Sequence, residues 1–193
     1  MEKINKVIDK YFDFMDEIGG MSNIDSMIPN CMVDHTKESE LGSKLYWKAI
    51  KSTVSESEIQ ELEDYFNHKL PKSYKEFLQH RHFIELELGS YGVRFFKNLP
   101  RTFVEDMKEE IENYYWNLIE RNYLPFAALS DYGVLCFDAN VTKPNNEYPI
   151  ITFDHEDEFI ESDNYSPDFE TMFQEFEENL DEWIDNKRKM NNN

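Results

Sequence analysis

VSESEIQELEDYFNHKLPKSYKEFL, residues 54–78, is the stretch of sequence that decides the fold. Ser55 is a natural N-cap and Glu58 lies three residues later, which is the spacing of a capping box, so we expect a helix to begin here. Asn67 suits the left-handed position that ends such a helix. Pro71 suits the first turn of a second helix, where its missing N–H group leaves no hydrogen bond unmade. The apolar faces of the two helices are Ile59, Leu62 and Phe66 in the first and Tyr74, Phe77 and Leu78 in the second.

Beyond this helix pair the sequence predicts an antiparallel sheet. Residues 83–88 alternate apolar and polar side chains and end at a glycine, as a half-buried strand does, and residues 93–96 can pair with them. Residues 124–129 and 134–137 flank a short turn and are typical of a hairpin. Residues 149–153 follow as a further strand.

Helical spacing of apolar residues recurs in three other places. Residues 4–18 carry it until a Gly-Gly pair, and residues 101–121 carry it after a proline. Ser166 as an N-cap and Pro167 at the first helical position predict a last helix. Its apolar stripe is Phe169, Met172, Phe173, Phe176, Leu180, Trp183 and Ile184. Helices that flank an antiparallel sheet make the expected fold class α+β.

The expected organisation is one domain with additions at both ends. Residues 1–44 form an N-terminal helix and an irregular extension, residues 45–187 form the α+β domain, and residues 188–193 are a polar tail. Within the extension, residues 21–44 combine proline, glycine and scattered polar residues, which predicts a loop. Residues 45–50 are short, aromatic and bounded by polar residues, as a strand can be.

The charge of the chain excludes some partners and permits others. The 193 residues carry a formal net charge of −20, yet 40% are hydrophobic and 15% aromatic, too many for a disordered acidic chain. Nucleic-acid and anionic-membrane partners are disfavoured, because both are bound through Lys and Arg. A basic protein partner is permitted, although net charge can also serve solubility alone.

The acidity is concentrated in one region. Residues 144–186 contain 15 acidic residues and no Lys or Arg, so the remaining 150 residues carry only −5. Such a run can be the solvated face of an amphipathic helix, or it can steer a basic partner into contact. Like charges along one helical face repel, and no neighbouring Lys offsets them, which favours the second interpretation.

The sequence lacks the patterns that carry common chemistries. There is no Gly-rich phosphate loop, no Gly-x-Ser-x-Gly elbow, no paired Cys and His of a zinc site, and no EF-hand frame in the acidic run after Asp154. We interpret His80 and His82 as surface histidines, and Cys31 and Cys136 as free thiols of a reducing compartment. The N-terminus lacks the apolar core of a signal peptide. We therefore expect a cytoplasmic protein with no catalysis, no cofactor and no metal site.

The segment from Val54 to Leu78 resembles the SUKH superfamily, specifically its Smi/Knr-type branch. The hallmark of that family is a capped helix carrying a glutamate, then a Leu-Pro pair, then Tyr and Phe-Leu, and here Glu63 stands seven residues before Leu70. The matching residues are Leu70, Pro71, Tyr74, Phe77 and Leu78, with Trp47 placed upstream as the family often has it. Residues 124–127 and 133–138 resemble its paired strands. The chain departs from the family at residues 79–82, which lack the usual Asn-Gly-Gly-like turn, and in the extra segments 1–44 and 101–121.

This resemblance implies an α+β domain with a curved, mostly antiparallel sheet. Bacterial members are widely immunity proteins that neutralise a polymorphic toxin, often a nuclease, and fungal members are cell-wall and signalling regulators. The leading interpretation is a non-catalytic immunity protein that binds a basic toxin, and the alternative is a scaffold or regulatory domain without a toxin partner. Glu63 is expected to be paired internally, because buried charges usually are.

The candidate partner-binding residues lie in the acidic region. Five are expected in a loop, where binding residues concentrate, and three on the solvent face of the last helix. They are Glu156, Asp157, Glu158, Glu161 and Asp163 in the first group and Glu177, Glu178 and Asp181 in the second.

Overall fold

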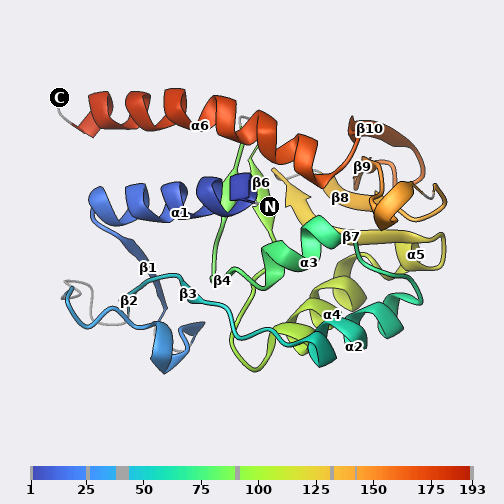
Figure 1. The fold of residues 1–193 in the computed structure, drawn as a ribbon, viewed down its shortest axis with the longest axis horizontal. Coiled ribbons are helices and arrows are strands. Elements are labelled where there is room, and N and C mark those ends of the chain that lie inside the picture. The colour runs from blue at the N-terminus through green and yellow to red at the C-terminus, as the bar shows by residue number, and fades with distance from the viewer. Residues whose placement is uncertain are drawn as a thin grey trace.

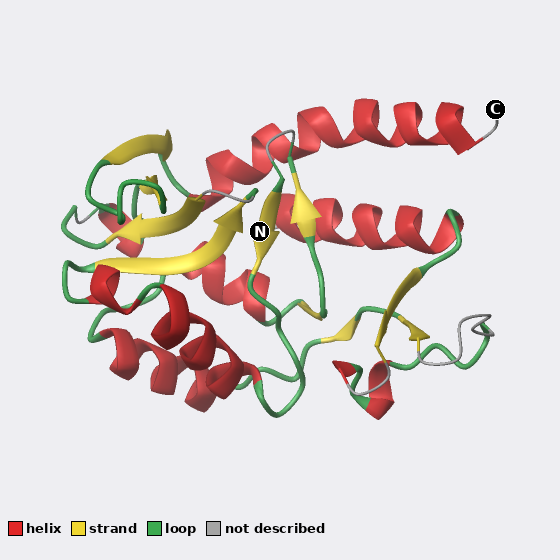
Figure 2. Cartoon of the chain, turned by 180° about the vertical axis from the view of Figure 1, so that it is seen from behind, coloured by secondary structure: helices red, strands yellow, loops and turns green. Residues whose placement is uncertain are grey.

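The centre of the fold is a six-stranded antiparallel sheet with strand order β10-β9-β8-β7-β6-β5 (Figures 1 and 2). The computed structural model describes residues 2–24, 27–37, 44–89, 92–130, 133–141 and 143–191. The strands of this sheet are β5 (Glu87–Leu88), β6 (Val93–Phe95), β7 (Tyr123–Leu129), β8 (Gly133–Asp138), β9 (Ile150–Asp154) and β10 (Ser162–Ser166). Bulges in β7, between Pro125 and Ala127, and in β10, between Asn164 and Ser166, help to curve it. The predicted α+β class is confirmed.

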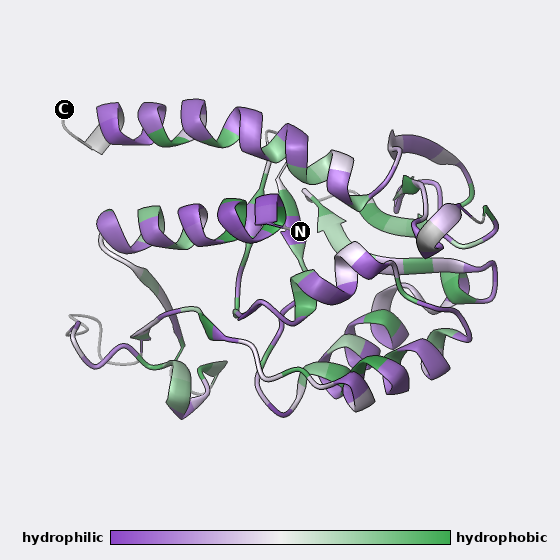
Figure 3. Cartoon of the chain, viewed as in Figure 1, coloured by the Kyte–Doolittle hydropathy of each residue, from purple (hydrophilic) through white to green (hydrophobic). Residues whose placement is uncertain are grey.

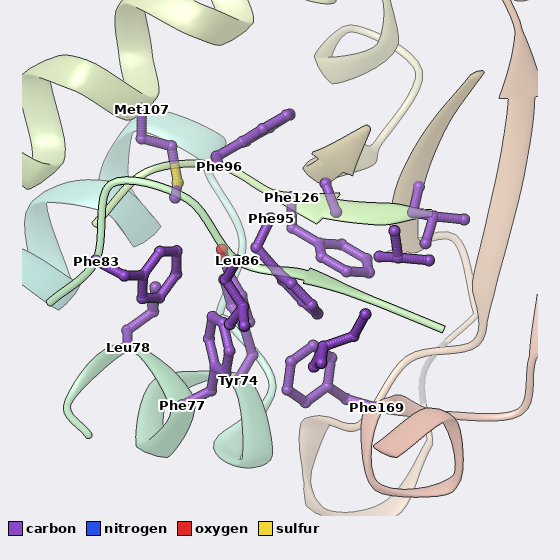
Figure 4. Close-up of a cluster of buried hydrophobic side chains, with 14 of the residues drawn as sticks. Tyr74, Phe77, Leu78, Phe83, Leu86, Phe95, Phe96, Met107, Phe126 and Phe169 are labelled. Atoms are coloured by element: carbon purple, nitrogen blue, oxygen red, sulfur yellow. The ribbon is translucent and has the colours of Figure 1, made fainter. Parts of the chain in front are cut away.

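The two central strands are covered on both faces. Apart from their ends, β7 and β8 are buried at every position, which suits the nearly continuous apolar runs YLPFAAL and GVLCFD. One face meets α3 (Lys72–Leu78) and α6 (Phe169–Asn191). Figure 4 shows Phe95 and Phe126 directed toward Phe77 and Phe169 on that side, whereas Met107 lies on the other side.

An aromatic cluster joins the helix pair to the sheet. Tyr74 and Phe77 of α3 stack on each other with ring centroids 5.7 Å apart, and Phe169 meets both rings edge-on. Phe126 and Phe137 stack across β7 and β8 at 4.2 Å. All five side chains are less than 2% exposed. Aromatic residues of the 54–78 stretch therefore form the centre of the core.

The capping prediction is confirmed. In α2 (Glu56–Phe66) the Ser55 hydroxyl accepts the Glu58 N–H group at 3.3 Å, and the Glu58 carboxylate accepts the Ser55 N–H group at 2.8 Å. Asn67 ends the helix in the left-handed region with φ of 54°. α3 begins directly after Pro71.

The strand predicted over residues 83–88 is correct only at its end. The structure has β4 (Arg81–His82), which pairs with β3 (Ile50–Lys51), and then β5. Between them Phe83 exchanges two backbone hydrogen bonds with Asn98, at 2.9 and 3.0 Å, in an isolated bridge. Residues 81–88 therefore pair first with β3, in a two-stranded sheet, and then with β6, in the six-stranded sheet.

The helix predicted over residues 101–121 is broken at Tyr115. α4 (Phe103–Tyr114) and α5 (Trp116–Ile119) are separated by Tyr115, whose φ of −134° is not helical. The Tyr115 ring stacks on Phe96 with centroids 5.8 Å apart. This non-local contact draws Tyr115 inward and leaves Tyr114 and Trp116 exposed.

The N-cap predicted for α6 is displaced by two residues. Ser166 is the last residue of β10, and Pro167 precedes the cap instead of following it. Asp168 is the capping residue, because its carboxylate accepts the Thr171 N–H group at 2.8 Å.

The N-terminal segment packs beside the end of the chain. α1 (Glu2–Glu17) lies along α6 in both views (Figures 1 and 2), and both helices are largely hydrophilic with recurring apolar residues (Figure 3). Trp183 meets Phe14 with ring centroids 5.4 Å apart, and Arg188 binds Glu17 at 2.6 Å.

The segment predicted as a loop, residues 21–44, contains β1 (Met21–Ile24), paired with β2 (Lys44–Trp47), and the single turn η2 (Asn30–Met32). One more short turn, η3 (Pro144–Asn146), precedes β9. No helix of the described part of the chain is long and apolar enough to span a membrane.

Candidate protein-binding surface

The connection between β9 and β10 presents carboxylates to solvent. Asp154 accepts the Glu156 N–H group at 2.8 Å, and Asp157 accepts those of Ile160 and Glu161 at 3.1 and 3.0 Å. These two aspartates therefore hold the turn. Glu156, Glu158 and Glu161 are exposed, and none has a side-chain hydrogen bond or ion pair among the described residues.

Asp163 lies in a strand and not in the predicted loop. It pairs with Thr152 of β9, and β10 is the last strand at that edge of the sheet. Pairing with β9 was not visible locally, because the residues of β10 are polar and mostly exposed. We call Glu156, Asp157, Glu158, Glu161 and Asp163 the acidic edge.

The three candidate residues on α6 form a separate group. Glu177 lies eight residues after the start of α6, which is about 12 Å along the helix axis. Glu178 is exposed, Glu177 is half-buried beside α1, and Asp181 binds Lys10 of α1. The repulsion expected between the acidic side chains of α6 is therefore partly offset by Lys10 of α1, which lies 171 positions from Asp181 in the sequence.

Two aromatic residues near the break between α4 and α5 are exposed, and one of them, Tyr114, adjoins the acidic edge. Tyr114 and Trp116 are 61% and 59% exposed, and Tyr114 lines a hollow of about 480 Å³ with His155 and Phe159 of the β9–β10 connection. Arg121 clamps this connection by donating to the Phe159 and Ile160 carbonyl oxygens. In the single helix predicted over residues 101–121, Tyr114 falls among the helically spaced apolar positions, and the break at Tyr115 leaves it exposed.

This arrangement suits recognition of a basic protein surface. Tyr and Trp are enriched in interface centres, and a field of carboxylates accelerates encounter with positive charge. Among the described residues, no three His, Cys, Asp or Glu side chains gather as a metal site requires. The strongest pKa perturbations belong to the core, where burial raises the pKa of the Tyr74 phenol and the Cys136 thiol.

The two histidines differ in environment, and the prediction of surface histidines is wrong for His82. His82 is 1% exposed, and its Nε2 accepts the Thr53 N–H group at 2.9 Å. Its Nδ1 therefore carries the proton and donates to the Asn98 side-chain oxygen at 3.0 Å. His80 contacts Asp9 of α1 at 2.8 Å. His82 is a satisfied structural residue.

Glu63 is paired internally, as expected. Its carboxylate is bound by Lys69 at 2.6 Å, by Lys75 at 3.2 Å and by the Leu70 N–H group at 3.0 Å. Burial raises the pKa of Glu63, but these three donors outweigh burial and hold the pKa below its usual value. The glutamate thus ties α2 to the Leu70-Pro71 step and to α3.

The capped helix, the Leu-Pro step and the antiparallel strands all lie within a region that matches a known protein family. Residues 53–175 match the SMI1 / KNR4 family (SUKH-1). The chain belongs to this family. SUKH proteins are known as immunity proteins and as SMI1/KNR4-type regulators. The matched SUKH-1 region includes the acidic edge, whereas α1 and residues 176–191 of α6 lie outside it. A search of curated proteins found no match.

Proposed function

We propose that this SUKH-1 protein is a non-catalytic, cytoplasmic immunity protein that binds and neutralises a basic toxin domain. A nuclease domain is an example of such a toxin. The observation that carries the proposal is the acidic edge, where Glu156, Glu158 and Glu161 are exposed and unpaired among the described residues, beside exposed Tyr114. Family membership supports a protein partner, and the charge of the surface supports a basic one.

The electrostatic part of the proposal has a physical basis. Residues 144–186 carry 15 acidic residues and no Lys or Arg, so their field attracts a positively charged domain before contact. The exposed aromatic rings then supply apolar area that charge alone does not, and this slows dissociation. The acidic edge sets the association rate, and the exposed aromatic side chains set the lifetime of the complex.

The first experiment co-expresses the protein with the product of the gene adjacent to its own, which the proposal expects to encode a toxin. We expect a stable complex and restored growth of the host. A protein that neither binds the toxin nor rescues growth contradicts the proposal and favours a regulatory interaction domain without a toxin partner.

The second experiment tests the surface. The double substitution Glu156→Lys and Glu158→Lys should lower the association rate about tenfold at low ionic strength, and much less at 1 M salt, where the screening length is about 3 Å. The matched control, Glu105→Lys and Glu109→Lys, changes the net charge equally on the exposed side of α4. If the two double variants associate with the partner at equal rates, the partner does not bind at the acidic edge.

A further inference from the structure

A second recessed surface lies where α1, α6 and β5 meet. Its first hollow has a volume of about 470 Å³ and is walled mainly by apolar side chains, among them Tyr11, Met15, Phe176, Leu180 and Trp183. Burial raises the pKa of the Tyr11 phenol to about 12, so the Tyr11 hydroxyl group is uncharged at neutral pH. A cavity of this size and lining is typical of a binding site for a large apolar group.

A second hollow lies beside the first. It has a volume of about 270 Å³ and includes Asp13 and Trp47 in its lining. Met15 and Met21 line both hollows, so the two lie side by side along α1, and we call them together the groove. Methionine side chains adapt their shape to different occupants.

The groove is acidic. Six carboxylates and three cationic groups line its two hollows: Asp9, Asp13, Asp16, Asp34, Glu85 and Glu87 against Lys48, Arg81 and Arg94. Asp9 is bound by Arg81 and Asp16 by Lys37, whereas exposed Asp13 has no ion pair among the described residues. The groove therefore disfavours anionic ligands and offers Asp13 to a cation.

An unused hydrogen-bond donor lies at the second hollow. Trp47 is 3% exposed, and its indole Nε1–H group has no acceptor among the described residues. Leaving a buried donor unpaired costs about 1–3 kcal/mol, so such donors are uncommon in folded proteins. Because this nitrogen atom is itself buried, a carbonyl oxygen of an occupant reaches it only when neighbouring lining side chains move aside, and the new hydrogen bond would then remove this cost.

We propose that this groove binds an extended segment of a polypeptide in which a large apolar side chain is flanked by lysine or arginine. The apolar side chain occupies the hollow beside Trp183, the cation meets Asp13, and a backbone carbonyl oxygen accepts the Trp47 indole N–H. A polypeptide supplies all three groups along one chain, which matches two adjacent hollows of different chemistry. The site is separate from the acidic edge and does not depend on the proposed toxin partner.

Nuclear magnetic resonance of the indole N–H groups tests the proposal, because the chain has three tryptophans in distinct places. Trp183 and Trp47 line the groove, and Trp116 is exposed on α5. The probe is an acetylated, amidated nine-residue peptide with a central phenylalanine and lysines on both sides. We expect saturable shifts at Trp183 and Trp47, with the Trp47 proton moving downfield, and no shift at Trp116.

Two control peptides and two variants complete the design. Replacing the phenylalanine by serine, or the lysines by glutamates, should weaken binding about tenfold, which corresponds to about 1.4 kcal/mol. Asp13→Lys should weaken binding of the original peptide about threefold, whereas Glu109→Lys, an exposed charge reversal on α4, should leave it unchanged. The proposal is overturned by unshifted indole signals, by a shift at Trp183 without one at Trp47, or by an equal shift at Trp116.

Discussion

Replacing Glu63 by glutamine tests how the hallmark glutamate of the Leu70-Pro71 motif acts. The Glu63 side chain is 4% exposed and is bound by the ammonium groups of Lys69 and Lys75 and by the Leu70 N–H group. Glutamine has nearly the same shape and can still accept the Leu70 N–H group. The substitution Glu63→Gln therefore removes the charge and replaces the oxygen that accepts from Lys69 by an amide NH2 group, which cannot accept a hydrogen bond.

The cost follows from the two lost charge-assisted hydrogen bonds. Each is worth about 1.5–3 kcal/mol when buried. Lys69 and Lys75 are 54% and 29% exposed, so both ammonium groups regain water in the variant, which offsets part of the loss. We expect the free energy of unfolding to fall by about 2–3 kcal/mol, which lowers the melting temperature of a domain of this size by about 5–10 °C.

The effect should depend on pH with a defined sign. The pKa of Glu63 is lower in the folded chain than its ordinary value of 4.5, so the unfolded chain binds the proton more readily. The stabilisation by the charged carboxylate is complete above about pH 5 and is lost as the pH falls through the folded pKa. The difference between wild type and Glu63→Gln should therefore shrink on acidification.

Urea unfolding followed by tryptophan fluorescence measures both effects. The matched control is Glu61→Gln on the same helix, where the carboxylate is 55% exposed and binds Lys108 at 2.6 Å. An exposed ion pair of this kind contributes about 0–1 kcal/mol. If Glu63→Gln destabilises the protein no more than Glu61→Gln at pH 7, the buried cluster does not hold the helices together as argued.

Two further predictions concern single positions. Asn67 has φ of 54°, so Asn67→Ala should destabilise the protein by about 1 kcal/mol in thermal unfolding while Asn67→Gly stays near wild type, and equal losses would contradict the capping argument. Cys31 is exposed, whereas Cys136 is buried and burial raises its thiol pKa, so a disulfide reagent at pH 8 should modify one thiol rapidly and the second only after unfolding. Cys31→Ser should abolish the rapid phase, and two rapid thiols in the wild type would refute the assignment.

Local sequence was sufficient at α2, where the interacting groups are close along the chain. Ser55 and Glu58 cap each other three residues apart, and Asn67 follows its own helix, so their roles were predicted correctly. The apolar residues of the 54–78 stretch likewise occupy the core positions that their spacing indicated. Family membership was also predicted from this stretch, because its motif is short and continuous.

The candidate surface was predicted in part. The exposure of Glu156, Glu158 and Glu161 followed from a polar run between strands, whereas the strand position of Asp163 depends on pairing with β9. Exposure of Tyr114 depends on the contact of Tyr115 with Phe96, which no helical periodicity encodes. The division into an extension (residues 1–44), a domain (residues 45–187) and a polar tail (residues 188–193) stays a prediction.

By itself, the sequence determined the caps of α2, the apolar faces of α2 and α3, the fold class and the regional charge, because each depends on neighbouring residues or on composition. Only the tertiary structure decided which acidic residues lie together and which are paired. Asp181 meets Lys10, and Arg188 meets Glu17, because α1 packs along α6. Such contacts join residues 171 positions apart and depend on how the helices dock, so spacing along the chain carries no signal of them.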